Sequence, residues 1–137
     1  MYVIEVTAEF CASHQLRLAD GSLEPLHGHN WHVQAKVESG QLDDLETVMD
    51  FHVLENMLKQ IINPWMNGHL NNVPPFDRQW NPSAERVAEH IGMELAKRMK
   101  APVRVAEVRV TEAAGCSAIF RDTTELRELS RGPLDAN

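Results

Sequence analysis

Two long runs of alternating residues constrain this chain more than any other feature. From position 2 to 12 the even positions are apolar, and from position 27 to 37 the odd positions carry two histidines and then apolar residues. A period of two is typical of a strand with one buried face. We therefore expect two strands that each carry histidine at one end of the buried face, namely His14 on the first and His27 and His29 on the second.

The middle of the chain has the period of helices. Residues 51–62 place apolar side chains at the i, i+3, i+4, i+7 spacing, with Asp50 as the expected N-cap and Asn63-Pro64 as the stop. A second helix is expected to begin at Asn81-Pro82, with Asn81 as its cap. Residues 65–80 form an irregular connection, and a connection this long is often functional.

The last part of the chain returns to extended structure. Residues 103–111 place Ala106, Val108 and Val110 on one face, Glu112 continues that face, and residues 116–120 form a short final strand. The order β-β-α-α-β-β predicts an α+β domain with a four-stranded antiparallel sheet and two helices on one face. We assign residues 1–121 to this single domain and residues 122–137 to a charged tail. The other sheet face is expected to be partly apolar, which favours a homo-oligomer.

Composition excludes some partners. The formal net charge of -7 over 137 residues argues against binding to nucleic acid or to an anionic membrane surface, because both need a basic face. Two cysteines are too few for a disulfide framework and fit a reducing compartment. With no basic and apolar leader at the start of this sequence, we expect a cytoplasmic location.

Three imidazoles that converge from two strands are a ligand set for catalytic zinc, which leaves a fourth position open. The alternative is that His27 and His29 are ordinary polar residues at a strand start, and spacing alone does not decide between the two. The other histidines of the strands and helices, His32, His52 and His90, are expected on outward faces.

Six stretches in order resemble the 6-pyruvoyl-tetrahydropterin synthase and 6-carboxy-tetrahydropterin synthase family, and the resemblance runs to about Phe120. They are Phe10-Cys11-Ala12-Ser13-His14, Leu26-His27-Gly28-His29-Asn30-Trp31, Val48-Met49-Asp50-Phe51, Leu70-Asn71-Asn72-Val73-Pro74-Pro75-Phe76, Asn81-Pro82-Ser83-Ala84-Glu85 and Val108-Arg109-Val110-Thr111-Glu112. Each stretch is weak alone, but six in the right order are specific.

The resemblance implies the tunnelling fold, a hexamer built as two trimers and an active site at a subunit interface. It also implies Zn²⁺ on His14, His27 and His29. Glu112 would anchor the pterin ring, because a carboxylate accepts two hydrogen bonds from an amine and a ring N–H. The substrate implied is dihydroneopterin triphosphate or a related pterin, changed at its side chain by Lewis-acid and general acid–base catalysis.

Two departures from the family pattern concern proton transfer. Most members carry a catalytic cysteine four residues before the first histidine of the His-Gly-His motif, where this chain has Leu23. Glu24 instead matches a subgroup that uses glutamate and releases 6-hydroxymethyl-dihydropterin for folate synthesis; the alternative is a plain loop glutamate. The family's Asp-His pair falls on Met66 and Asn67, and only the nearby His69 is available as a substitute.

Three functions remain open on this basis. The first is a zinc-dependent pterin synthase or lyase in which Glu24 and His69 are catalytic. The second is a non-catalytic, zinc-containing pterin-binding homologue. The third is a 6-carboxy-tetrahydropterin synthase of queuosine biosynthesis.

Overall fold

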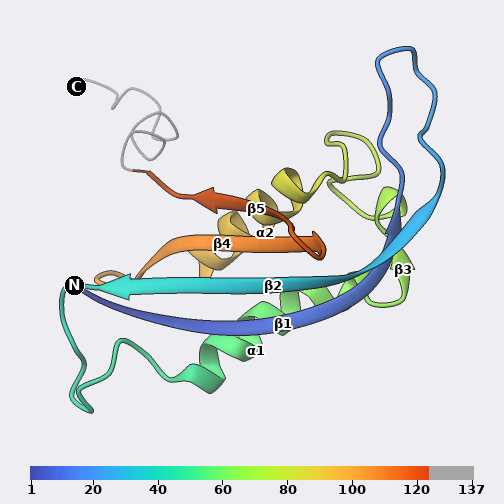
Figure 1. Cartoon of the computed structure of the whole chain (residues 1–137). Coiled ribbons are helices and arrows are strands. Elements are labelled where there is room, and N and C mark those ends of the chain that lie inside the picture. The colour runs from blue at the N-terminus through green and yellow to red at the C-terminus, as the bar shows by residue number, and fades with distance from the viewer. Residues whose placement is uncertain (124–137) are drawn as a thin grey trace, which may run out of the picture.

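The computed structural model describes residues 1–123, which form a five-stranded sheet with two helices against one face (Figure 1). The strand order is β3-β1-β2-β4-β5. The strands are β1 (Tyr2–His14), β2 (His27–Ser39), β3 (Gly68–His69), β4 (Arg104–Ala113) and β5 (Cys116–Arg121); the helices are α1 (Phe51–Ile62) and α2 (Ala84–Arg98). The α+β class and the placement of the helices are confirmed.

The prediction of four antiparallel strands is wrong in one respect. The connection between the helices contains β3, which pairs with β1 in parallel and makes the sheet mixed. Two short 3-10 turns, Asn63–Trp65 and Leu70–Asn72, flank it. A two-residue strand is too short to produce an alternating pattern, so the sequence offered no signal for it.

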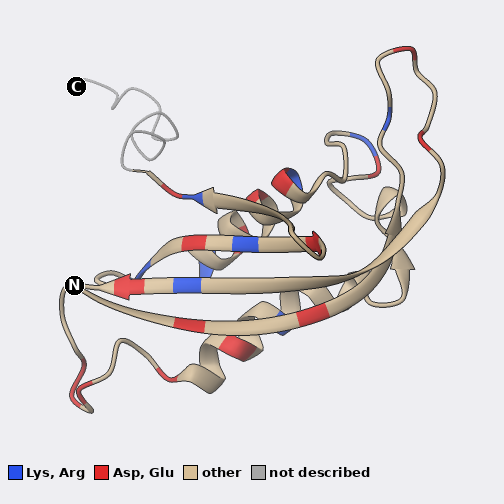
Figure 2. Ribbon diagram, viewed as in Figure 1, with Lys and Arg blue, Asp and Glu red and all other residues tan. Residues whose placement is uncertain are grey.

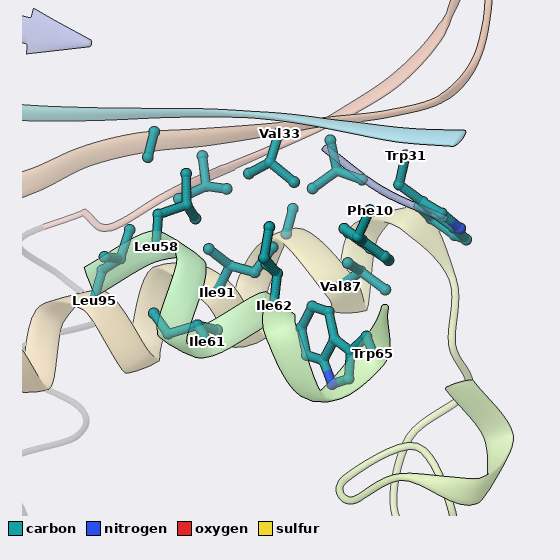
Figure 3. Packing of buried hydrophobic residues seen from close by; sticks show 14 of the residues in the cluster. Phe10, Trp31, Val33, Leu58, Ile61, Ile62, Trp65, Val87, Ile91 and Leu95 are labelled. Atoms are coloured by element: carbon teal, nitrogen blue, oxygen red, sulfur yellow. The ribbon is translucent and has the colours of Figure 1, made fainter. Parts of the chain in front are cut away.

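The core lies between the sheet and the helices, as Figure 3 shows for fourteen of its side chains. The inward positions of β1 and β2 supply Phe10, Trp31 and Val33, and the facing stripes of the helices supply Leu58 and Ile91. Phe10 and Trp31 stack with ring centroids 5.6 Å apart. Because the long strands alternate, this buried face continues directly into the histidines at one end of the sheet.

The helix starts are set by two caps. Asp50 accepts a hydrogen bond from the His52 N–H and caps α1, as expected. The cap of α2 is Ser83, which accepts from the Arg86 N–H, so the assignment of Asn81 as cap is wrong. The Asn81 side chain is used elsewhere, because it holds the backbone of Arg17.

A bulge near the start of β4 changes which residues there face the core, compared with the prediction. Lys36 of β2 pairs with Glu107 and Val37 pairs with Val105, so Ala106 is the extra residue. Such a residue reverses the alternation on either side of it. Val105 is therefore buried in place of Ala106, whereas Val108 and Val110 face inward as predicted.

The outer face of the sheet is charged at its centre, which corrects the expectation of a partly apolar face. Figure 2 shows acidic and basic residues side by side on β1, β2 and β4. Lys36 bridges Glu107 and Glu5 across three strands, and Arg121 joins Glu107 from β5. The hydrogen bond with Glu107 raises the pKa of Lys36 and lowers that of Glu107. Charges of opposite sign on neighbouring strands thus cover this surface.

His90 of α2 does not face solvent as predicted. It is half-buried among Trp65, Phe76 and Trp80, whose ring centroids lie 5.7, 5.8 and 6.5 Å from its own. The connection between the helices folds over this side of α2, and a helical pattern cannot reveal such a cover. Burial lowers the pKa of His90.

Two further points depend on which residues the structure describes. Most of the expected charged tail, residues 124–137, lies outside the described residues. Within residues 1–123, no helix is long and apolar enough to cross a membrane.

Candidate active site

The two long strands bring the three predicted histidines together. His14 pairs directly with His27 in the antiparallel register, and His29 lies opposite Ala12, one step along the same face. The ring centroids are 4.5 Å apart for His14 and His27, 5.2 Å for His14 and His29, and 4.9 Å for His27 and His29. Trp31, the next inward residue of β2, packs against His14 and His29 and separates the cluster from the core.

Backbone carbonyls set the orientation of two of these rings. The Nδ1 of His14 lies 2.8 Å from the Pro82 carbonyl oxygen, and the Nδ1 of His27 lies 2.8 Å from that of Pro25. A carbonyl oxygen only accepts, so both Nδ1 atoms are the donors. In the neutral imidazole this leaves the Nε2 lone pair free to bind a metal, an arrangement common among metal-ligating histidines.

Glu112 completes the cluster from β4. Its Oε1 lies 3.0 Å from His14 Nε2, 2.9 Å from His29 Nε2 and 3.7 Å from His27 Nε2. His29 Nε2 is buried and makes no hydrogen bond of acceptable geometry. One ligand atom from each of the four residues lies within 4.8 Å of the others. Three imidazoles, one of them with an unpartnered buried Nε2, and a carboxylate fit a divalent metal ion that takes nitrogen and oxygen ligands.

The electrostatics of the cluster favour neutral His29. Burial lowers its pKa most, the Glu112 carboxylate opposes that shift, and the neighbouring His14 and His27 add to it. A neutral ring is the form that binds a metal.

Glu24 lies at the edge of this cluster, in the loop between β1 and β2. Its Oε1 lies 3.8 Å from His27 Nε2 and accepts a hydrogen bond of 2.9 Å from the Leu16 N–H. The Glu24 N–H in turn donates to the Leu16 carbonyl oxygen at 3.0 Å. These two bonds hold the carboxylate beside the histidines, so the structure brings Glu24 to the predicted site.

Two asparagines fasten the same loop, and the sequence analysis gave them no such role. The Asn71 side chain accepts from the Gln15 N–H at 2.9 Å and donates to the Gln15 carbonyl oxygen at 2.7 Å. Asn81 makes the same pair of bonds to Arg17, at 2.7 and 3.0 Å. Both asparagines lie in stretches that carry the family resemblance, which was the available signal.

The structure does not bring His69 to the histidine cluster of its own chain. His69 lies on β3 beside Ser13, and its Nδ1 is 2.9 Å from the Ser13 Oγ. Ser13 and His14 are successive residues of a strand and point to opposite faces. At the expected position of the Asp-His pair, Met66 is exposed and Asn67 turns the chain with φ 57°, its N–H donating to the Cys11 carbonyl oxygen.

Sequence comparison identifies relatives over most of this chain. The family model described as 6-pyruvoyl tetrahydropterin synthase matches residues 3–123. A 6-carboxy-5,6,7,8-tetrahydropterin synthase of Helicobacter pylori is 29% identical over 69 residues, which cover 49% of this chain and 34% of that protein. The match thus spans about a third of the length of that curated relative.

Solved structures share the fold. The Caenorhabditis elegans 6-pyruvoyl tetrahydropterin synthase superposes with a TM-score of 0.75 at 19% identity, covering 89% of this chain and 96% of that one. A Plasmodium vivax 6-pyruvoyltetrahydropterin synthase with alanine in place of a catalytic glutamate gives 0.68 at 17% identity, covering 90% and 99%. These similarities confirm the tunnelling fold.

Proposed function

Since this chain belongs to the 6-pyruvoyl tetrahydropterin synthase family, we propose that it is a zinc-dependent pterin synthase or lyase that acts on dihydroneopterin triphosphate or a related pterin. The observation that carries this proposal is the convergence of two carboxylates, Glu24 and Glu112, on three histidines whose ligand nitrogens lie close together. In this proposal the three histidines bind the metal ion, Glu112 binds the pterin ring and Glu24 transfers a proton.

His14, His27 and His29 would hold the zinc ion. When bound, zinc supplies Lewis-acid chemistry at the substrate side chain. The carbonyls of Pro82 and Pro25 keep two of the rings turned toward it, and Trp31 closes the apolar side of the site. The Glu112 carboxylate can accept two parallel hydrogen bonds from the amino-pyrimidine edge of a pterin.

Glu24 is our candidate general base. The Leu16 N–H fixes one carboxylate oxygen beside His27, within reach of a substrate side chain held at the histidines. The Plasmodium vivax protein of the same fold has a glutamate described as a catalytic residue, which is consistent with this candidate.

His69 has a role only if subunits share sites. In its own chain it faces away from the cluster, so we propose that it acts in the site of a neighbouring subunit of a homo-oligomer, a hexamer of two trimers, in the cytoplasm. In that arrangement a subunit alone has an incomplete proton relay.

Product analysis tests the proposal. Zinc-loaded protein is incubated with dihydroneopterin triphosphate and the pterins are separated by chromatography. We expect conversion in the wild type and a loss of about 100-fold or more in kcat for Glu24→Gln, the usual contribution of a general base. Zinc content should stay unchanged. The matched control is Glu9→Gln, an exposed glutamate on the outer face of β1 paired with His32.

The products distinguish the alternatives. A 6-hydroxymethyl-dihydropterin product supports the glutamate-dependent lyase, and a 6-carboxy-tetrahydropterin product supports the activity of the Helicobacter pylori relative. Met66 and Asn67 in place of the Asp-His pair favour a binding protein as the second candidate. Pterin binding that depends on Glu112 without conversion would support that candidate and refute the role of Glu24.

A further inference from the structure

Glu112 lies where a metal ligand would lie. In a tetrahedral zinc site with bonds of about 2.0–2.1 Å, neighbouring ligand atoms are about 3.3 Å apart. The distances from Glu112 Oε1 to the three histidine Nε2 atoms, 2.9, 3.0 and 3.7 Å, fall on both sides of that value. The carboxylate oxygen therefore has the spacing of a fourth ligand toward the imidazoles.

The hydrogen bonds of the rings strengthen this assignment. His14 and His27 use their Nδ1 protons on the Pro82 and Pro25 carbonyls, so the Nε2 of each ring faces the Glu112 oxygen, and His14 Nε2 is within hydrogen-bond distance of it. His29 Nε2 is as close to that oxygen and makes no hydrogen bond. A proton on one ring can satisfy only one of these three contacts, whereas a metal cation shared by all four groups would satisfy them together.

The backbone at Glu112 leaves the side chain free to take a second position. In the β4–β5 ladder Thr111 pairs with Ser117 and Ala113 with Cys116, so Glu112 is the unpaired residue of a bulge. The pairing of β4 with β2 ends one residue earlier, at Thr111. A bulge of this kind re-aims a side chain beside a site. No ladder hydrogen bond has to break when the Glu112 side chain turns.

We propose that Glu112 is the fourth metal ligand in the resting protein and that a pterin ring draws it away, so that the metal gains an open position only when substrate is bound. This inference rests on the proposed function, in which Glu112 also binds the ring. One carboxylate oxygen cannot serve the metal and the ring edge at the same time. Loss of the anionic ligand also leaves a larger positive charge at the metal, and therefore a stronger Lewis acid.

Cobalt substitution with a ring-only probe tests the exchange. Co²⁺ has visible ligand-field bands that are intense in four-coordinate sites and weaken at higher coordination number. The probe is unsubstituted pterin, which has no side chain to reach the metal. We expect intense bands in the wild type that change when pterin binds. Glu112→Gln should show altered bands without pterin, no change on adding it, and cobalt binding weaker by at least about tenfold.

Two variants keep the test specific. Glu24→Gln, which alters the other carboxylate near the histidines, should leave the resting bands unchanged. Glu112→Ala replaces Glu112→Gln if the latter misfolds by circular dichroism. The inference is overturned if the wild type and Glu112→Gln have the same bands, or if pterin binds, as seen by its fluorescence, without changing them.

The outcomes separate this inference from the proposed function. Identical bands together with turnover of dihydroneopterin triphosphate would refute the ligand exchange and leave the enzyme assignment standing. Failure of the wild type to bind cobalt would refute the metal site and both proposals with it.

Discussion

The two asparagine contacts that hold the Glu24 loop give a prediction with a calculable size. Asn81 binds the N–H and the carbonyl of Arg17, and Asn71 binds those of Gln15. Gln15 and Arg17 are two positions apart, so the two asparagine side chains bond to the backbone after β1 in the way that a neighbouring strand would. Leu16 lies between these two residues and bonds to the Glu24 backbone and carboxylate.

The expected cost of each change follows from the bonds removed. Asn81→Ala removes two hydrogen bonds in a partly buried setting, each worth about 0.5–1.5 kcal/mol net. We expect the free energy of unfolding to fall by about 1–3 kcal/mol, which for a chain of this length lowers Tm by about 4–10 °C. Asn71→Ala should cost a similar amount. The double variant should lose less than the sum, because both act on one short segment.

Thermal and urea unfolding at a fixed protein concentration measure these changes, since an oligomer makes Tm depend on concentration. The matched control is Asn72→Ala, an exposed asparagine next to Asn71, which should shift Tm by less than about 2 °C. If Asn71→Ala and Asn72→Ala have the same small effect, the contacts do not hold the loop and the reasoning fails.

Two further predictions concern histidines. The pKa of His90 is lowered by burial, so the unfolded chain binds this proton more readily; stability is full above the unfolded-state pKa of about 6.5 and falls as the pH drops through the folded-state pKa. Glu94 opposes this shift and Lys97 adds to it. Urea unfolding at pH 5 and pH 7.5 should therefore show a smaller loss for His90→Gln than for the wild type, and equal losses would contradict this. Metal analysis of His27→Ala should show loss of zinc, whereas His32→Ala, on the outer face, should keep it; full retention in His27→Ala would refute the ligand assignment.

Period and parity were enough to predict the part of the fold that carries the histidine cluster. Alternation in β1 and β2 places His14, His27 and His29 on the buried face, whereas burying both faces leaves the register open by steps of two residues, so the pairing of His14 with His27 comes from the structure. The same argument from parity failed at Ala106, where one extra residue reverses which side chains of β4 face the core. The apolar residues do change parity between Val105 and Val108, but Ala106 also fits the face of Val108, and this concealed the bulge in the pattern.

The contacts that orient the site are backbone contacts, and this explains why they were not predictable. The Pro82 and Pro25 carbonyls fix two imidazoles, and their position depends on how the connecting segments fold over the end of the sheet. Asn81 was predicted as a helix cap because the same side chain is suited both to capping a helix and to bonding the backbone of another segment. Only the tertiary position of Arg17 decides between those uses.

The Asn81 side chain and the carbonyl contacts link the proposed metal site to the loop that carries Glu24, the proposed general base. Pro82 follows Asn81 directly, so the residue that orients His14 is attached to the residue that holds Arg17. A shift of this segment would turn the His14 ring and release the Glu24 loop together. Loss of Asn81 should therefore weaken zinc binding as well as turnover, whereas loss of Asn71, which bonds to Gln15 and not to the segment that carries Pro82, should weaken zinc binding less. A zinc affinity equally reduced in both variants would show that the two contacts are not separable in this way.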